Sequence, residues 1–300
     1  MTYIIENANL LKNDRLEQNS LLIKEDRIDS IRPSFERFSY MRVNASSFVM
    51  TPPHVLFCPQ FPSRQSFQVM KKFYIDELIT KGSTMFLTYV EIDKEYLLQP
   101  AFDNMKTVLL NSPIDYTIGV KIPLRLLTTS FLIKCKRAKI PAIFVEVEDE
   151  QELKEIPWGW LREAMFPYNS PLIPIFVAET EKQREQVGVY WQELLHMEKI
   201  PFIGHELKEN VPISREDLCK LGIYPVKSGL HHGGEVSYNL YLKDDLDNGT
   251  CEKELFLQLK ERLLVTVHKG TVIRAGKDVQ FRPGFGEHVV IKIPAFFKVN

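Results

Sequence analysis

The sequence lacks the features that mark several large classes of protein. Its 300 residues contain no run of about 18 uncharged apolar residues, so no transmembrane helix and no membrane partner are expected. The amino-terminal stretch has no basic start followed by an apolar run, so no signal peptide is expected. No glycine-rich phosphate-binding loop is present. We therefore expect a cytoplasmic protein.

Cysteine is scarce and charge is balanced. The four cysteines are far apart, and no two have the C-x-x-C spacing typical of zinc and redox sites. Such scattered cysteines fit a reducing compartment. Lys plus Arg number 38 and Asp plus Glu number 39, so the formal net charge is −1. Because proteins that bind nucleic acid usually carry a basic excess, no nucleic-acid partner is expected.

What remains is the composition of an ordinary globular protein. Hydrophobic residues make up 44% of the chain and charged residues 26%, which excludes general disorder. A chain of this length buries a sufficient core without disulfides. It forms either one large domain or two smaller ones.

Both ends of the chain show the pattern of β structure, with short apolar segments separated by polar turns. The clearest segments are Tyr3–Ile5, Ser20–Ile23, Arg27–Ile31, Val236–Leu242, Leu263–His268, Thr271–Arg274 and Val289–Ile293. Lys269 and Gly270 between two of them favour a hairpin. We expect a small β-sandwich domain built from residues 1–53 and 216–300.

Residues 54–215 instead alternate strand-like runs with helical patterns. The expected helices are Phe67–Thr80, Leu124–Arg137, Glu150–Met165 and Glu181–Glu198. The expected strands are Thr84–Val90, Asp115–Val120, Ala142–Val147, Leu172–Ala178 and Ile200–Ile203. Gly82 follows the first helix as a C-cap. This alternation predicts parallel strands with helical crossovers, an α/β domain.

Both flanks resemble the amidohydrolase superfamily. Residues 221–242, LGIYPVKSGLHHGGEVSYNLYL, are similar to the family's G-L-Y-P-x-K-G stretch and the G-S-D-A-D turn that follows it. Residues 268–286, HKGTVIRAGKDVQFRPGFG, resemble its closing strands. The opening residues 4–31 are also similar. The order of these motifs indicates the branch of hydantoinases, dihydropyrimidinases and allantoinases.

This resemblance implies a metal-dependent (β/α)₈ barrel with a β-sandwich, and it places the metal ligands at strand ends. The two histidines of the first strand correspond to Cys58 and Gln60, which we expect to share the pocket side. The bridging lysine corresponds to Phe144, or to Glu146 if the register slips by two. The histidine of the next strand corresponds to Val177. Every position that we can align has lost its ligand.

The barrel also looks incomplete. A full barrel needs at least about 200 residues, whereas residues 54–215 supply about 160 and contain five or six plausible strands. Without a metal or a substitute base, water is not activated near neutral pH. We therefore expect a catalytically inactive amidohydrolase-like protein without a cofactor, acting as a binding protein or a homo-oligomeric scaffold. The alternative is a hydrolase of cyclic amides with a remodelled site and zinc as its metal.

Several strand ends carry polar side chains that form a candidate relict pocket for a small molecule or a cation. Together with the aligned positions above, they are Glu91, Glu146, Glu179, His205 and Glu206. Alternatively, these acidic residues cap the helices that follow. A rebuilt active site requires Glu146, Glu179 and His205 to converge.

The other histidines and Cys58 can be explained by structural roles. We expect His231 and His232 to lie on a solvated turn away from the barrel mouth, and His196 to have a structural role on its helix. Cys58 is either a nucleophile or a buried apolar residue. The amphipathic segment Glu252–Arg262 covers the chain's own sandwich or a partner.

Overall fold

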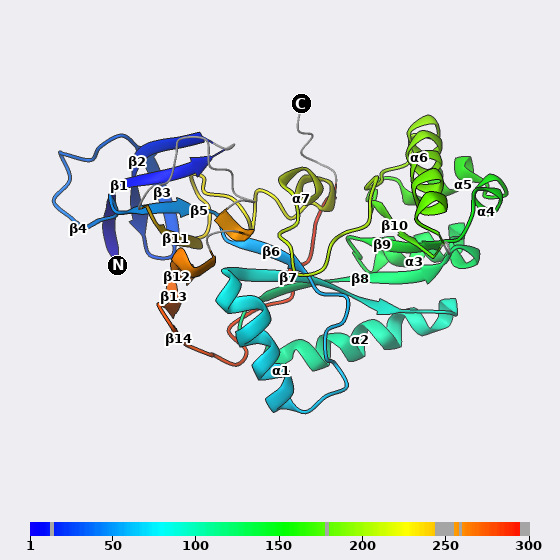
Figure 1. Cartoon of the computed structure of the whole chain (residues 1–300), viewed down its shortest axis with the longest axis horizontal. Helices are drawn as coiled ribbons and strands as arrows, with labels where there is room; N and C mark the ends of the chain where they lie inside the picture. Colours follow the sequence, from blue (N-terminus) through cyan, green and yellow to red (C-terminus); the bar gives the residue numbers. More distant parts are fainter. Residues whose placement is uncertain (13–14, 178–179, 244–254, 258–259, 295–300) are drawn as a thin grey trace.

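A computed structural model describes residues 1–12, 15–177, 180–243, 255–257 and 260–294 (Figure 1). These residues form two β-sheets, one parallel and one largely antiparallel, with helices around the parallel sheet. No helix among them is long and apolar enough to cross a membrane.

The parallel sheet has five strands in the order β10-β9-β8-β7-β6 and curls into half a barrel. The strands are β6 (His54–Phe57), β7 (Ser83–Glu91), β8 (Asp115–Pro123), β9 (Ile143–Val147) and β10 (Leu172–Phe176). The helices are α1 (Phe67–Phe73), α2 (Leu98–Val108), α3 (Thr129–Arg137), α4 (Glu150–Lys154), α5 (Trp158–Met165) and α6 (Glu181–Met197). The predicted α/β alternation of this region is confirmed.

The second sheet joins strands from both ends of the chain, where we expected a β-sandwich. Its order is β14-β13-β12-β11-β5-β1-β2-β3, with β4 also paired to β1, so all nine strands belong to one hydrogen-bonded sheet. The strands are β1 (Thr2–Lys12), β2 (Arg15–Lys24), β3 (Arg27–Arg32), β4 (Met41–Asn44), β5 (Phe48–Thr51), β11 (Tyr238–Leu242), β12 (Leu263–His268), β13 (Thr271–Ala275) and β14 (Asp278–Val279).

Some elements differ from the expectation. The helix expected over Glu150–Met165 is split into α4 and α5, because Pro157 between them cannot donate a backbone hydrogen bond. Gly82 ends its helix with a φ of 75°, as expected, but residues 74–78 before it form a π-turn. The segment Val289–Ile293 is irregular and not a strand. Helices α2 and α7 (Arg215–Leu221) were not predicted.

A single irregular segment, residues 204–213, takes the place of further barrel strands. We call it the strap. It leaves the parallel sheet after Phe202, which pairs with Leu172 of β10, and returns to the opposite edge. There Glu209 pairs with Phe57, and Ile213 donates to the Val55 carbonyl at 2.9 Å. The strap therefore covers the β6 edge, where the last strand of a closed barrel would pair.

Two apolar clusters lie on opposite faces of the parallel sheet. The outer cluster fills the space between the sheet and the helices and includes Phe86, Phe131 and Trp191. The inner cluster fills the concave face and includes Phe57, Phe144 and residues of α7. Because side chains alternate along a strand, neighbouring residues belong to different clusters.

Candidate functional site

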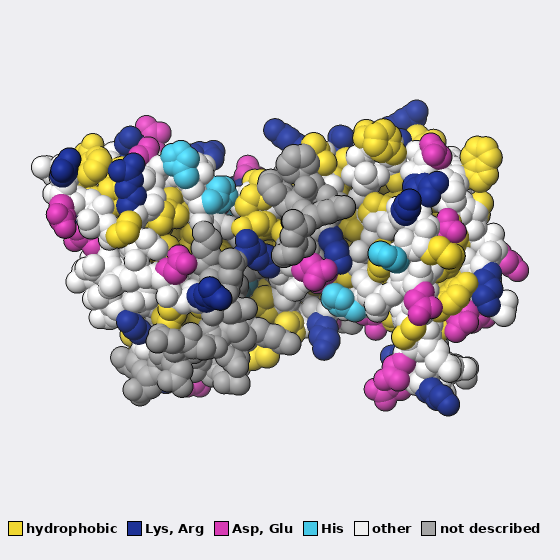
Figure 2. All heavy atoms as spheres, turned by 90° about the horizontal axis from the view of Figure 1, so that it is seen from above, with side chains coloured by type: hydrophobic (Ala, Val, Ile, Leu, Met, Phe, Trp, Pro, Cys, Tyr) yellow, Lys and Arg dark blue, Asp and Glu magenta, His cyan; other side chains and the backbone are white. Residues whose placement is uncertain are grey.

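A groove of about 2930 Å³ runs along the concave side of the parallel sheet, from the carboxyl ends of its strands at Pro59 and Phe176 to Pro52 and His54 at the start of β6. It runs between the two lobes of the molecule, which Figure 2 shows with a hollow between them. Its floor includes Phe57, Tyr89 and Phe144, and residues of α6, α7, the strap and β1–β3 form its walls. Barrel proteins bind their ligands at the carboxyl ends of the strands. Because the groove includes these ends, it is the candidate site.

The floor of the groove is a layer of aromatic rings. The rings of Phe57 and Phe144 are stacked with centroids 5.0 Å apart and planes 12° apart. The Tyr89 ring lies 5.1 Å from Phe144. Gly119 on the intervening strand makes room for them, since a Cβ there would lie 3.0 Å from the Phe144 ring. The position aligned with the bridging lysine is thus occupied by a packed apolar side chain.

The expectation that Cys58 and Gln60 share the pocket side is corrected by the structure. Cys58 lies in the outer cluster against the helices, and Gln60 is exposed. The residues facing the groove are their neighbours Phe57 and Pro59. Cys58 is buried away from the groove, and this burial raises the pKa of its thiol to about 12; both observations favour the buried apolar residue over the nucleophile.

Two of the predicted carboxylates meet at the rim, outside the groove lining. Glu91 of β7 and Glu146 of β9 each form an ion pair with Lys121 of β8 at 3.0 Å. Partial burial acts to lower the pKa of Lys121, but the hydrogen bonds that its ammonium donates to Glu146 and Glu91 outweigh this effect and raise that pKa. Lys121 is therefore a shared partner of both carboxylates and balances one of their two negative charges.

The remaining predicted residues are scattered. Val177 is exposed. The Glu206 carboxylate accepts a hydrogen bond from the Phe176 backbone at 2.8 Å, which closes the end of β10. Glu179 lies outside the described residues, as does most of the segment Glu252–Arg262. The described residues of the rebuilt-site alternative do not converge, because Glu146 pairs with Lys121 and His205 pairs with a residue of α7.

The α7 residue that pairs with His205 is Asp217, which the sequence analysis did not identify. His205 Nε2 lies 3.2 Å from Asp217 Oδ2, and Ser214 donates to the same oxygen at 2.6 Å. Burial acts to raise the pKa of Asp217, but the hydrogen bonds from His205 and Ser214 outweigh it and lower that pKa. The spacing S-x-x-D at residues 214–217 was an available signal, because it marks a helix start.

The two adjacent histidines also line the groove, but on a turn beside β3 and the amino end of β6, away from the carboxyl ends of the strands, as expected. His231 is half-buried, and His232 is exposed and hydrogen-bonded through Nδ1 to the Asp29 carbonyl. They enter the wall because the turn that carries them packs on β3.

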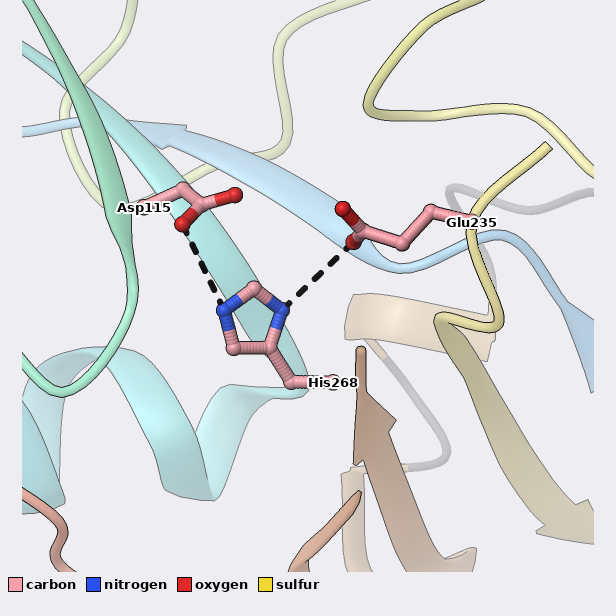
Figure 3. A group of neighbouring side chains, drawn as sticks. All are labelled: Asp115, Glu235 and His268. Atoms are coloured by element: carbon pink, nitrogen blue, oxygen red, sulfur yellow. Dashed lines mark ion pairs between the residues drawn. The ribbon is translucent and has the colours of Figure 1, made fainter. Parts of the chain in front are cut away.

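Among the described residues, one group has ligand atoms close enough together to hold a metal ion. It consists of Asp115, Glu235 and His268, whose ligand atoms lie within 4.8 Å of one another (Figure 3). Asp115 begins β8, so this group lies at the amino ends of the strands, away from the groove. Its carboxylates already have cationic partners. Lys227 Nζ lies 2.6 Å from Asp115 and 2.8 Å from Glu235.

These contacts make the group an ionic cluster. Lys269 adds a second ammonium 2.7 Å from Asp115, and His268, 1% exposed, lies between the two carboxylates at 3.5 and 3.9 Å. Burial acts to raise the pKa of Asp115, but its contacts with His268 and Lys227 hold it well below its usual range. The described residues thus do not fit a binuclear metal centre at either end of the sheet.

Comparisons with known proteins give a fold but no sequence family. No protein-family model and no curated protein matches the chain. Among solved structures, a dihydropyrimidinase from Brevibacillus agri has a TM-score of 0.60 and 11% identity over 100% of both chains. A D-hydantoinase from Bacillus sp. AR9 has a TM-score of 0.57 and 11% identity, covering 97% of this chain and 99% of that one. A D-hydantoinase from Thermus sp. has a TM-score of 0.56 and 9% identity, covering 98% and 100%. The chain therefore has the fold of the hydantoinases and dihydropyrimidinases.

Proposed function

We propose that this chain is a hydantoinase-fold protein without the family's metal centre, and that it binds a ligand in its groove instead of hydrolysing cyclic amides. The observation that carries the proposal is the aromatic layer of Phe57, Tyr89 and Phe144 at the strand ends. A metal site needs several polar ligands about 2 Å from the ion, and stacked rings exclude both ion and water from this position.

The polar groups around the layer support the same conclusion. Glu91 and Glu146 are both engaged by Lys121, and Glu206 accepts a hydrogen bond at the end of β10. No nucleophilic water is formed near neutral pH without a metal or a base that replaces it. The groove itself is retained, with an apolar floor and a polar rim, and this is the usual composition of a ligand site.

We further propose that the chain works as a homo-oligomer in the cytoplasm, with residues 1–53 and 216–300 as one domain and 54–215 as the other. The edge strand β4 supports self-association, because Met41 and Val43 are 53% and 48% exposed there and its one charged side chain, Arg42, is paired with Glu6 of β1. Light scattering tests this part, and a monodisperse monomer would contradict it.

Hydrolysis assays test the central proposal against the alternative of a remodelled hydrolase. Hydantoin and dihydrouracil are incubated with the protein alone and with added zinc or manganese. The proposal predicts no turnover above the buffer rate in any condition. Metal-dependent turnover that is abolished by a chelator would establish the hydrolase instead.

A further inference from the structure

The pair of His205 and Asp217 is a built feature of the groove wall that the aligned family positions do not explain. Asp217 is 2% exposed and is fixed at the first turn of α7, where its backbone N–H donates to Ser214 Oγ at 3.1 Å. The same carboxylate holds His205 Nε2 at 3.2 Å. Since Nε2–H is committed to this buried acceptor, the tautomer and the orientation of the imidazole ring are set.

The other ring nitrogen is the atom that meets the groove. The His205 side chain is 61% exposed and lines the groove, so Nδ1 is accessible to a ligand. The hydrogen bond to Asp217 raises the pKa of His205, against the opposing effects of partial burial and Lys220; Glu216 adds to the rise. On its own segment, the neighbouring Glu206 carboxylate is engaged by the Phe176 backbone. The imidazole therefore takes up a proton more readily than a free histidine.

The pair stands at the border between the rim and the apolar floor. Ile203, two residues before the histidine, and Leu218, directly after the aspartate, belong to the same apolar cluster as Phe57 and Phe144. Arg215, two residues before the aspartate, lines the same wall, with its guanidinium 4.5 Å from the Tyr224 ring centroid. Phe57 and Phe144 are buried, so the floor ring that a ligand can contact is the half-buried Tyr89, with the cationic donors of the wall beside it.

We propose that the groove binds an organic acid with an apolar ring, whose carboxylate accepts a hydrogen bond from His205 Nδ1–H while the ring lies against Tyr89 at the aromatic floor. This inference rests on the proposed binding function and specifies its ligand class. A carboxylic acid stays ionised from about pH 5 upward, so the pH dependence of binding comes from the histidine. Affinity falls as pH rises through the raised pKa of His205, because the Nδ1 donor is then lost.

The test compares naphthylacetate with the uncharged naphthylacetamide by isothermal titration calorimetry. At about pH 6 the wild-type protein is expected to bind the acid about tenfold more tightly than at about pH 8.5, whereas binding of the amide is the same at both. His205→Gln removes the pH dependence for the acid and leaves the amide unchanged. His196→Gln, an exposed histidine on α6 that does not line the groove, behaves as wild type.

The outcomes separate this inference from the function on which it rests. If the amide binds but the acid shows no preference at low pH, or if His205→Gln keeps the full pH dependence, the acid site is refuted and the groove remains a binding site. If neither probe binds and the protein turns over hydantoin with a metal, both the inference and the proposed function fail.

Discussion

The two ends of the parallel sheet differ in chemistry. At the carboxyl ends, Phe57, Tyr89 and Phe144 form an apolar layer under an open groove. At the amino ends, Asp115 and Lys227 are the centre of an ionic cluster that joins the parallel sheet to the antiparallel one. In barrel enzymes the carboxyl end carries the chemistry and the amino end carries stability. Among the described residues, the carboxyl end has one buried carboxylate, Asp217 in the groove wall, and no group of ligand atoms that could hold a metal, which is why we propose binding over catalysis.

The largest expected effect comes from breaking the ionic cluster. Lys227→Met leaves the buried Asp115 carboxylate without its nearest ammonium, and removing one partner of a buried pair costs about 3–5 kcal/mol of unfolding free energy. Urea unfolding measures the loss. The double variant Asp115→Asn/Lys227→Met is expected to be more stable than the single one, since Asp115 then no longer buries a charge that has lost one of its two ammonium partners. A loss below about 1 kcal/mol in the single variant would show that the cluster is not buried as described.

Truncating the aromatic layer tests the other end of the sheet. Phe144→Ala is expected to cost about 3 kcal/mol, because it opens a cavity between Phe57 and Tyr89. Phe144→Leu, which keeps most of the volume, is expected to cost about 1 kcal/mol. Thermal unfolding of both variants measures the difference. Equal stability of the alanine variant and the wild type would mean that the rings are not packed as a layer.

The pH dependence of stability is expected to reside at the amino end. His288 packs on the rings of Phe102 and Tyr116, and burial, together with Lys106, lowers its pKa to about 4. The pKa of His288 is lower in the folded protein than in the unfolded chain. As the pH falls, the unfolded chain therefore takes up the proton first, and this favours unfolding. Stability is therefore complete above about pH 6.5 and falls as pH decreases toward 4, by roughly 1–2 kcal/mol.

Urea unfolding between about pH 4 and pH 7 measures this slope. The matched variant His288→Phe, whose ring does not titrate, is expected to lose His288's contribution to the slope. An unchanged slope in the variant would assign the acid sensitivity to other groups.

The smallest effect is expected at the rim. Glu91 is 67% exposed in its ion pair with Lys121, so Glu91→Gln costs at most about 0.5 kcal/mol. The same urea titration measures it, and the variant serves as the exposed-charge control for Lys227→Met. A cost above about 2 kcal/mol would contradict the contrast between exposed rim charges and the buried cluster.

The sequence predicted the strands of the half-barrel well, because buried parallel strands are nearly continuous apolar runs such as Ile143–Val147. It predicted less well which face of a strand each side chain occupies. An alignment in which Cys58 faces the pocket differs by one residue from the structure, and a shift of one residue exchanges the two faces of a strand.

The sequence could not predict which distant residues the fold brings into contact. Asp115 and Lys227 are separated by more than a hundred positions, and no local pattern links them. Asp217 had a local signal in the S-x-x-D spacing, but its segment was assigned to the β region, so the helix that presents it to His205 was missed.

The metal content of the protein, purified without chelator and measured by plasma mass spectrometry, tests the central claim most directly. If the aromatic layer has replaced the metal centre, the protein contains less than about 0.1 equivalent of zinc, manganese, iron or nickel. One or two equivalents that survive dialysis and are lost in a variant of the groove rim would contradict the account, because they would place a metal centre where we describe packed rings.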